Sequence, residues 1–278
     1  MEQTGVEPTV PELIGIWQDA AQAVHDLCTD VTDEQWRAAT PCPGWSVGDI
    51  VAHVIDIEQL MSGVPQPEHE PDWSALPHVT NDLSRVTEVG VDRRRAMDRS
   101  DVLPELEATI ARRRAQFDAV APDEEVIGPF GNRTTMDRLL RIRIFDIWAH
   151  EQDIRAALGR DGGWGSPAAA VAQEQIIRAL PYVWSRTVAA PQGAVLRVQI
   201  TDDRLARDVA VVVNDDRKGA ATEPVDDAAV WLTGTWPDVM RLACGRVDPA
   251  DPEVRSRLVL RGEPALVEAL LPALSITP

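Results

Sequence analysis

The sequence predicts an α+β protein in two parts, a helical bundle over residues 1–160 and a smaller α+β domain over residues 161–278. Two observations lead to this fold class. Helical patterns fill the first part, whereas the second part carries short β-like runs with a few helices between them. A glycine-rich segment, GRDGGWGSP at residues 159–167, lies between the two parts and is typical of a domain junction.

The first part is expected to consist of helices joined by loops. Ser46 is a good N-cap and Asp49 follows it by three residues, which is close to a capping box, while Gly159 ends the last helix. The expected helices cover residues 11–28, 46–63, 81–99, 104–120 and 134–158, with a proline-rich loop over residues 64–77.

The second part is expected to begin with a helix over residues 168–186 and to continue as a sheet with helices packed on it. Four runs have β-like composition: AVLRVQI (194–200), DVAVVV (208–213), AAVWLTG (228–234) and RLVLRG (257–262). Two helical pieces lie among them, at residues 237–245 and 264–274.

The acidic composition argues against several classes of partner. The net charge is −18, from 45 acidic and 27 basic side chains, whereas a nucleic-acid-binding protein normally carries a basic footprint. Neither a nucleic acid nor an anionic membrane surface is therefore an expected partner. The arginine runs at residues 93–95 and 112–114 are interpreted as solvated helix faces.

Localisation follows from three further features of the sequence. No apolar run approaches the ~18 residues of a membrane span, and the N-terminal stretch MEQTGVEPTVPEL has no apolar signal region. The three cysteines, Cys28, Cys42 and Cys244, are widely spaced and form no CxxC pattern, which favours a reducing compartment. A cytoplasmic protein is expected, either a monomer or a homodimer.

The helix over residues 134–158 carries a polar line in the middle of an apolar face. Four polar residues, spaced by three, four and three positions, form this line: Arg143, Asp146, His150 and Asp153. Apolar residues flank it on both sides, Leu139, Ile142, Phe145 and Ala149 on one, and Leu140, Ile144, Ile147, Ile154 and Leu158 on the other. A buried charge is costly unless it is paired, hydrogen-bonded or bound to a metal, so the line indicates a site.

A third ligand can come from the second helix. His53 is the polar member of an otherwise apolar stripe there, and Asp146 and His150 stand at positions i and i+4, so both can reach one ion. Two imidazoles and a carboxylate describe a catalytic metal site with open positions. Two simpler interpretations stay open: His53 as a hydrogen-bonded core residue, and the Asp146–His150 pair as a supporting or capping contact.

Three segments resemble the mycothiol-dependent maleylpyruvate isomerase family of the DinB-like superfamily. These segments are TPCPGWSVGDIVAHVIDIE (40–58), RIFDIWAHEQDIRAALG at the end of the polar helix, and TGTWPDVMRLACGR (233–246). The resemblance implies a DinB-like four-helix bundle followed by a small α/β domain similar to sterol-carrier-type folds.

The resemblance also implies a mechanism. A divalent metal, usually zinc, would be held by His53, Asp146 and His150, and would activate the thiol of mycothiol for attack on a small electrophile. An arginine of the C-terminal domain contributes in the isomerase, and Arg246 is the candidate here. The expected function is a metal-dependent mycothiol S-transferase or isomerase. The isomerase has Glu where this chain has Asp146, which argues against carrying over the isomerase activity in particular.

Several roles have more than one interpretation. Arg143 and Asp153 are expected at the cofactor site, where they could orient the ligands or pair with each other across the bundle. Cys42 is interpreted as structural rather than as a nucleophile, and Trp45 as fixing the start of the second helix. Two rival functions are kept: a non-catalytic small-molecule-binding or regulatory protein on the same fold, and a metal-dependent hydrolase.

Overall fold

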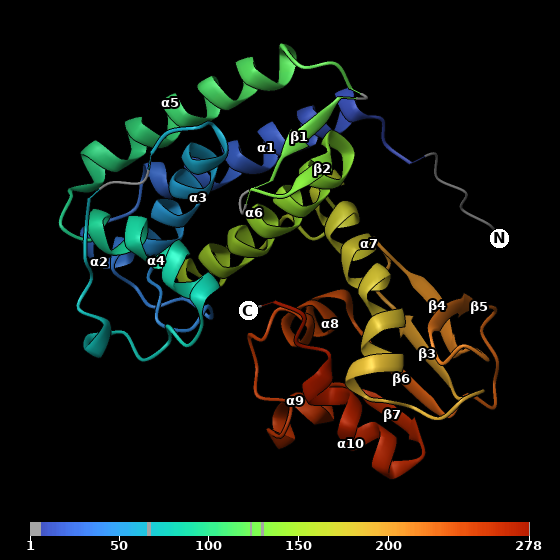
Figure 1. Cartoon of the computed structure of the whole chain (residues 1–278). Coiled ribbons are helices and arrows are strands. Elements are labelled where there is room, and N and C mark those ends of the chain that lie inside the picture. Colours follow the sequence, from blue (N-terminus) through green and yellow to red (C-terminus); the bar gives the residue numbers. More distant parts are fainter. Residues whose placement is uncertain (1–6, 66–67, 123, 129–130, 278) are drawn as a thin grey trace. The chain divides into compact units, whose positions relative to one another are not determined.

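The α+β class predicted from the sequence is confirmed by the computed structural model, which describes residues 7–65, 68–122, 124–128 and 131–277. The chain forms two compact units that divide between Gly163 and Trp164. The first unit is helical with one small hairpin, and the second carries a five-stranded sheet (Figure 1). Within the described residues, no helix is long and apolar enough to cross a bilayer.

The long helices of the first unit pack together (Figure 1). Helix α1 lies against α5 and α6, while α3 lies against α4, α5 and α6. The helices are α1 (Val10–Thr29), α2 (Asp33–Trp36), α3 (Val47–Met61), α4 (Asp82–Arg94), α5 (Arg99–Asp118) and α6 (Met136–Leu158), with a 3₁₀ turn at Trp73–Ala75. A hairpin of β1 (Glu125–Ile127) and β2 (Arg133–Thr135) leads directly into α6.

Local sequence signals fix the ends of the two helices that matter most here. Ser46 caps α3: its Oγ accepts from the Asp49 N–H at 3.2 Å, and the Asp49 carboxylate accepts from the Ser46 N–H at 2.9 Å, so the predicted capping box forms. Thr135 caps α6, and Gly159 ends it with φ = 63°, in the left-handed region.

Two expectations for the first unit were wrong. Helix α5 begins at Arg99 rather than at residue 104, so Pro104 lies inside it, one turn beyond its start, where it removes a single backbone hydrogen bond. The arginine runs are not wholly solvated either. Arg94 and Arg113 are buried, because each has a buried carboxylate to pair with, Asp56 for the first and Glu58 for the second.

The second unit is a mixed sheet with helices. The strand order is β5-β4-β3-β6-β7, in which β3 and β6 are parallel and the other neighbours antiparallel. The strands are β3 (Val195–Ile200), β4 (Arg207–Val213), β5 (Gly219–Thr222), β6 (Val230–Gly234) and β7 (Val259–Gly262). The helices are α7 (Pro167–Tyr182) with a π-helical turn at Val183–Thr187, α8 (Trp236–Ala243), α9 (Pro252–Ser256) and α10 (Pro264–Ala273).

Candidate metal centre

The three residues predicted as metal ligands meet between α3 and α6. His53 Nε2 lies 3.3 Å from Asp146 Oδ2, and His150 Nε2 lies 3.8 Å from Asp146 Oδ1. One ligand atom from each residue lies within 4.8 Å of the others. Both histidines are 5 % exposed, whereas the Asp146 side chain is 29 % exposed, so the cluster is buried with one accessible member.

Trp45 packs against both imidazoles. Its ring centroid lies 4.7 Å from that of His53 and 5.5 Å from that of His150. The indole N–H donates to Glu88 Oε2 at 2.9 Å, which fixes the ring. These tilted ring contacts limit the rotation of both histidines, so Trp45 packs on the site as well as preceding α3.

Arg143 donates to the Asp146 carboxylate and holds it in place. Its Nη1 donates to Asp146 Oδ2 at 2.7 Å, and its Nε donates to Glu58 Oε1 at 2.8 Å. Glu58 has no exposed surface and also accepts from Arg113 Nε at 3.1 Å and from Trp17 Nε1 at 3.2 Å. A chain of charges therefore runs from Arg113 through Glu58 and Arg143 to Asp146.

His150 is held at its second nitrogen by a carboxylate. Its Nδ1 lies 3.1 Å from Asp153 Oδ2, and Asp153 is 2 % exposed. A hydrogen bond of this kind leaves Nε2 as the free lone-pair nitrogen, turned toward Asp146. His53 has no such support among the described residues, since its buried Nδ1 makes no hydrogen bond.

Electrostatics favours the protonation states that bind a metal. Burial lowers the pKa of His53 below its ordinary value, although the nearby Asp146 carboxylate acts in the opposite direction. The lowered pKa favours the neutral ring. Burial alone would raise the pKa of Asp146. The neighbouring Arg143 and His53 outweigh it, and the pKa of the carboxyl lies well below its usual range. A neutral imidazole and an ionised carboxylate are the ligand forms.

The donor set fits a divalent cation. Zinc bonds to nitrogen and oxygen of about 2.1 Å place two tetrahedral ligands about 3.4 Å apart, close to the 3.3 Å and 3.8 Å separations at Asp146. His150 is supported at Nδ1 by Asp153, as metal-ligating imidazoles commonly are, whereas the unpartnered nitrogen of His53 is Nδ1 rather than the Nε2 that faces Asp146.

The remaining predicted site residues fall in different places. Arg143 and Asp153 both lie behind the ligands, one on Asp146 and one on His150, rather than paired with each other. Arg246 belongs to the second unit, where it follows α8 and its Nη1 donates to the Cys244 carbonyl oxygen at 2.6 Å.

Glu58 is the site residue that the sequence reasoning missed. It stands with Asp56 in the run HVIDIEQL, where two acids interrupt an apolar helix. Both prove buried, Glu58 on Arg113 and Arg143, and Asp56 on Arg94. Acids at apolar positions of α3 were therefore the signal that could have found it.

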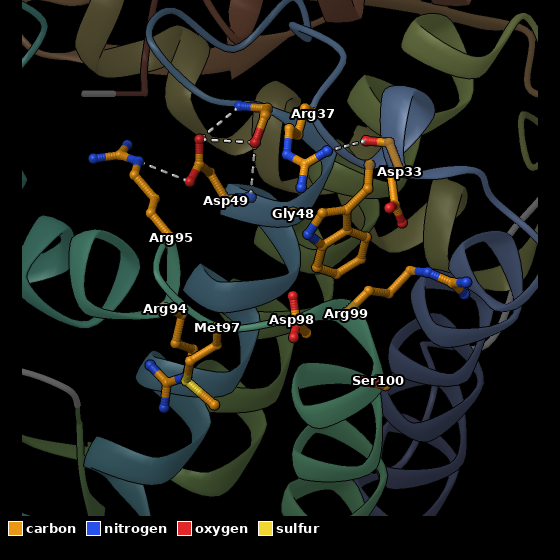
Figure 2. A pocket seen from close by; sticks show the side chains of 12 residues that line it. Asp33, Arg37, Gly48, Asp49, Arg94, Arg95, Met97, Asp98, Arg99 and Ser100 are labelled. Carbon is orange, nitrogen blue, oxygen red and sulfur yellow. Dashed lines mark hydrogen bonds and ion pairs between the residues drawn. The ribbon is translucent and has the colours of Figure 1, made fainter.

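A hollow of about 470 Å³ lies elsewhere in this unit, near the beginnings of α3 and α5 (Figure 2). Two of its arginines are engaged with neighbouring oxygen atoms. Arg95 Nε donates to Asp49 at 2.9 Å, and Arg37 Nη1 donates to the Asp33 carbonyl oxygen at 3.4 Å. The group formed by His53, Asp146 and His150 is the better candidate site because its potential ligand atoms converge on one point.

Comparisons with known proteins agree with this assignment of fold. A family model described as "Mycothiol maleylpyruvate isomerase N-terminal domain" matches residues 17–155, half of the chain, and this range contains His53, Asp146 and His150. The crystal structure of the mycothiol-dependent maleylpyruvate isomerase is similar with a TM-score of 0.59 and 15% identity, over 92% of this chain and 95% of that one. A histidine-to-alanine mutant of that enzyme matches over the same shares, with a TM-score of 0.57 and 14% identity. No curated protein sequence gives a significant match.

Proposed function

The chain belongs to the mycothiol maleylpyruvate isomerase family, and from this premise we propose that it is a metal-dependent mycothiol S-transferase or isomerase. The substrate class is a small electrophile, and the co-substrate is a low-molecular-weight thiol. Mycothiol is proposed as this thiol because the descriptions of the family model and of the crystal structures of similar fold both name it.

One observation carries this proposal: His53, Asp146 and His150 converge from two helices on one point inside the bundle. Three protein ligands leave positions open for a thiol, as catalytic rather than closed structural sites do. A zinc ion held there would bind the thiol sulfur and lower its pKa, which supplies a thiolate nucleophile at neutral pH.

The side chains around the ligands have separate roles in this proposal. Arg143 holds Asp146 ionised and oriented, and Asp153 fixes the tautomer of His150. Trp45 covers both imidazole rings and reduces the access of water to them. Arg246, from the second unit, is the proposed contact for an anionic electrophile.

Aspartate at position 146 separates this chain from the isomerase's own pattern, which has glutamate. The side chain is one methylene shorter, and Arg143 already occupies Oδ2 at 2.7 Å. The other oxygen, Oδ1, lies 3.8 Å from His150 Nε2, while Oδ2 lies 3.3 Å from His53 Nε2, so each carboxylate oxygen faces one imidazole. We propose thiol transfer to a small electrophile as the general activity, with maleylpyruvate one substrate to be tested.

The test measures metal content and thiol conjugation on the same samples. Full-length protein loaded with Zn²⁺ is incubated with mycothiol and a panel of electrophiles that includes maleylpyruvate, and products are followed by mass spectrometry. The proposal expects about one ion per chain and thiol-dependent turnover. His53→Ala should lose most of both, whereas His25→Ala, on α1 and outside the candidate cluster, should keep both.

Other outcomes would contradict the proposal. Turnover without added thiol would favour a metal-dependent hydrolase. Ligand-induced thermal stabilisation without turnover would favour the non-catalytic alternative. Absence of stoichiometric metal from protein supplied with Zn²⁺ would remove the basis of the mechanism.

A further inference from the structure

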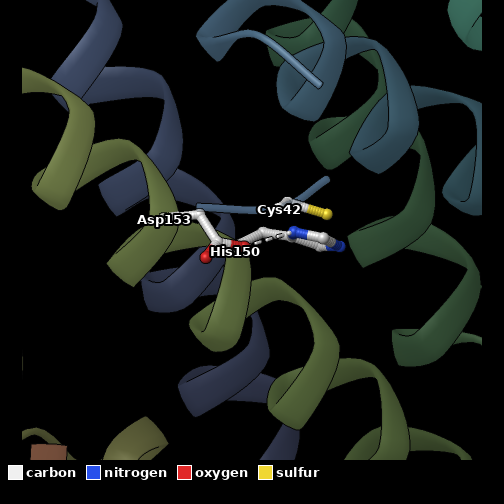
Figure 3. A group of neighbouring side chains, drawn as sticks. All are labelled: Cys42, His150 and Asp153. Carbon is white, nitrogen blue, oxygen red and sulfur yellow. Dashed lines mark hydrogen bonds and ion pairs between the residues drawn. The ribbon is translucent and has the colours of Figure 1, made fainter. Parts of the chain in front are cut away.

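His150 also belongs to a second group of potential ligands. Cys42, His150 and Asp153 each offer one ligand atom, and these atoms lie within 4.8 Å of one another (Figure 3). His150 Nδ1 and Asp153 Oδ2 are 3.1 Å apart, and both residues are buried. Cys42 is half-buried, so the group has an accessible side.

The loop before α3 holds Cys42 in place. The Cys42 N–H donates to Thr40 Oγ1 at 3.2 Å, and its carbonyl oxygen accepts from the Trp45 N–H at 3.2 Å. Pro43 and Gly44 complete this turn, in which Gly44 has φ = 79°, a conformation that favours glycine. The turn that places Trp45 on the imidazoles therefore also places the thiol beside His150.

This group is distinct from the first ligand set. Among the described residues, His150 is the member that the two sets share. Its Nε2 is turned toward Asp146, whereas its Nδ1 is turned toward Asp153. An ion bound by Cys42 would thus use the opposite edge of the same ring.

We propose that Cys42, His150 Nδ1 and Asp153 form a second site, for a thiophilic divalent cation such as Cd²⁺ or excess Zn²⁺, that competes with the first. A thiolate, an imidazole and a carboxylate suit such ions, and the thiolate gives preference to the softer ones. Binding releases the thiol proton of Cys42 to solvent as the metal–sulfur bond forms.

Competition follows from the single lone pair of a neutral imidazole. When Nε2 serves the first set, the ring proton is on Nδ1 and is donated to Asp153. An ion on Nδ1 needs that nitrogen's lone pair, so the proton moves to Nε2 and the first set loses a ligand. Excess thiophilic metal should therefore inhibit turnover, a consequence that rests on the proposed function.

The experiment titrates Cd²⁺ into chelator-treated, full-length protein and follows the ultraviolet charge-transfer band of a cadmium–thiolate bond. The wild type should develop the band. Cys42→Ser should lack it and still bind one ion by elemental analysis, whereas His53→Ala, which breaks only the first set, should keep it. Asp153→Asn should weaken the titration about tenfold or more.

A second readout uses the unmodified chain. Cd²⁺ should protect Cys42 from alkylation in the wild type, measured on its proteolytic peptide, so the proposal stays testable even where a variant folds poorly. In the turnover assay, Zn²⁺ beyond one equivalent should inhibit the wild type at least tenfold more strongly than Cys42→Ser.

Two results would overturn the second site. A band that survives in Cys42→Ser would assign the sulfur to Cys28 or Cys244, and a band lost in His53→Ala would mean that one ion spans both sets. Either result leaves the proposed function standing if thiol turnover persists. Conversely, a Cys42-dependent band without any thiol turnover would sink the proposed function alone.

Discussion

At the scale of one residue, Glu58 shows how the candidate site of His53, Asp146 and His150 is supported. This carboxylate has no exposed surface, yet it accepts from Arg143, Arg113 and Trp17. Two buried guanidinium groups need a buried negative charge, because an unpaired charge in the interior is costly. Glu58 therefore stabilises the bundle, and it also fixes the arginine that orients Asp146.

Replacing Glu58 by Gln should destabilise the protein by about 3 kcal/mol, since breaking a buried ion pair leaves an uncompensated charge. Because Gln has nearly the same shape as Glu, the loss of stability reports the removal of the charge. Urea unfolding of the full chain measures it. The matched control is Asp118→Asn, which removes an acid that pairs with Arg114 at the exposed end of α5 and should change stability by about 0.5 kcal/mol or less. Equal stabilities of the two variants would contradict this role of Glu58.

The three cysteines should react very differently with an alkylating reagent. Cys28 is fully buried, and burial raises the pKa of its thiol to about 12, so very little thiolate exists at neutral pH. Cys42 is half-buried at the turn before α3, whereas Cys244 is buried at the end of α8. Iodoacetamide on the native protein should therefore modify Cys42 first, by more than tenfold in rate, as read by peptide mass spectrometry. Preferential labelling of Cys28 in the folded protein would contradict the burial described here.

At the scale of an element, the close approach of α3 and α4 depends on Gly90. A Cβ at this position would overlap the carboxylate of Asp56, which is itself buried and paired with Arg94 at 3.2 Å. Alanine usually favours a helix over glycine by about 1 kcal/mol. At Gly90 the displacement of a buried ion pair should outweigh this gain.

Gly90→Ala should therefore lower the free energy of unfolding by about 2 kcal/mol, whereas Gly15→Ala should raise it by roughly 0.5–1 kcal/mol. Gly15 lies within α1, and a methyl group added there would meet no atom within 4 Å, so only the helix propensity changes. Thermal and urea unfolding of both variants would check the opposite signs. Stabilisation by Gly90→Ala would show that α3 and α4 separate at little cost.

The sequence predicted the elements whose signals are local. The ends of α3 and α6 follow from Ser46 and Gly159, and the polar line of α6 follows from periodicity alone. Strand β5 was not predicted, because its run GAAT has little β propensity and exists through pairing with β4. The hairpin before α6 was missed for a different reason, since each of its strands has three residues.

The same distinction between local and long-range signals applies to the residues of the candidate site. His53, Asp146 and His150 could be proposed because each breaks an apolar pattern on its own helix. The support given by Glu58 and the position of Cys42 beside His150 could not, because they depend on which helices and turns meet in space. Long-range partners of a buried charge leave little trace in the periodicity of either helix.

At the scale of the whole molecule, the two units carry different parts of the proposed chemistry. The three proposed metal ligands and their supporting residues belong to the first unit, and Arg246 belongs to the second. The backbone before Arg246 is fixed, since Gly245 ends α8 with φ = 64° and the Arg246 N–H donates to the Arg241 carbonyl oxygen at 2.8 Å. Its side chain donates to the Cys244 carbonyl oxygen at 2.6 Å.

Arg246→Ala should separate metal binding from turnover. Metal content by elemental analysis should stay at the wild-type value, because no ligand is altered, while thiol-dependent turnover of an anionic electrophile should fall by tenfold or more through loss of a charge-assisted contact. Arg241→Ala, in the last turn of α8, is the matched control and should leave both unchanged. Loss of metal in Arg246→Ala would mean that the substitution disturbs the fold of the first unit. Unchanged turnover of an anionic electrophile would remove Arg246 from the mechanism and leave the second unit without an assigned part in it.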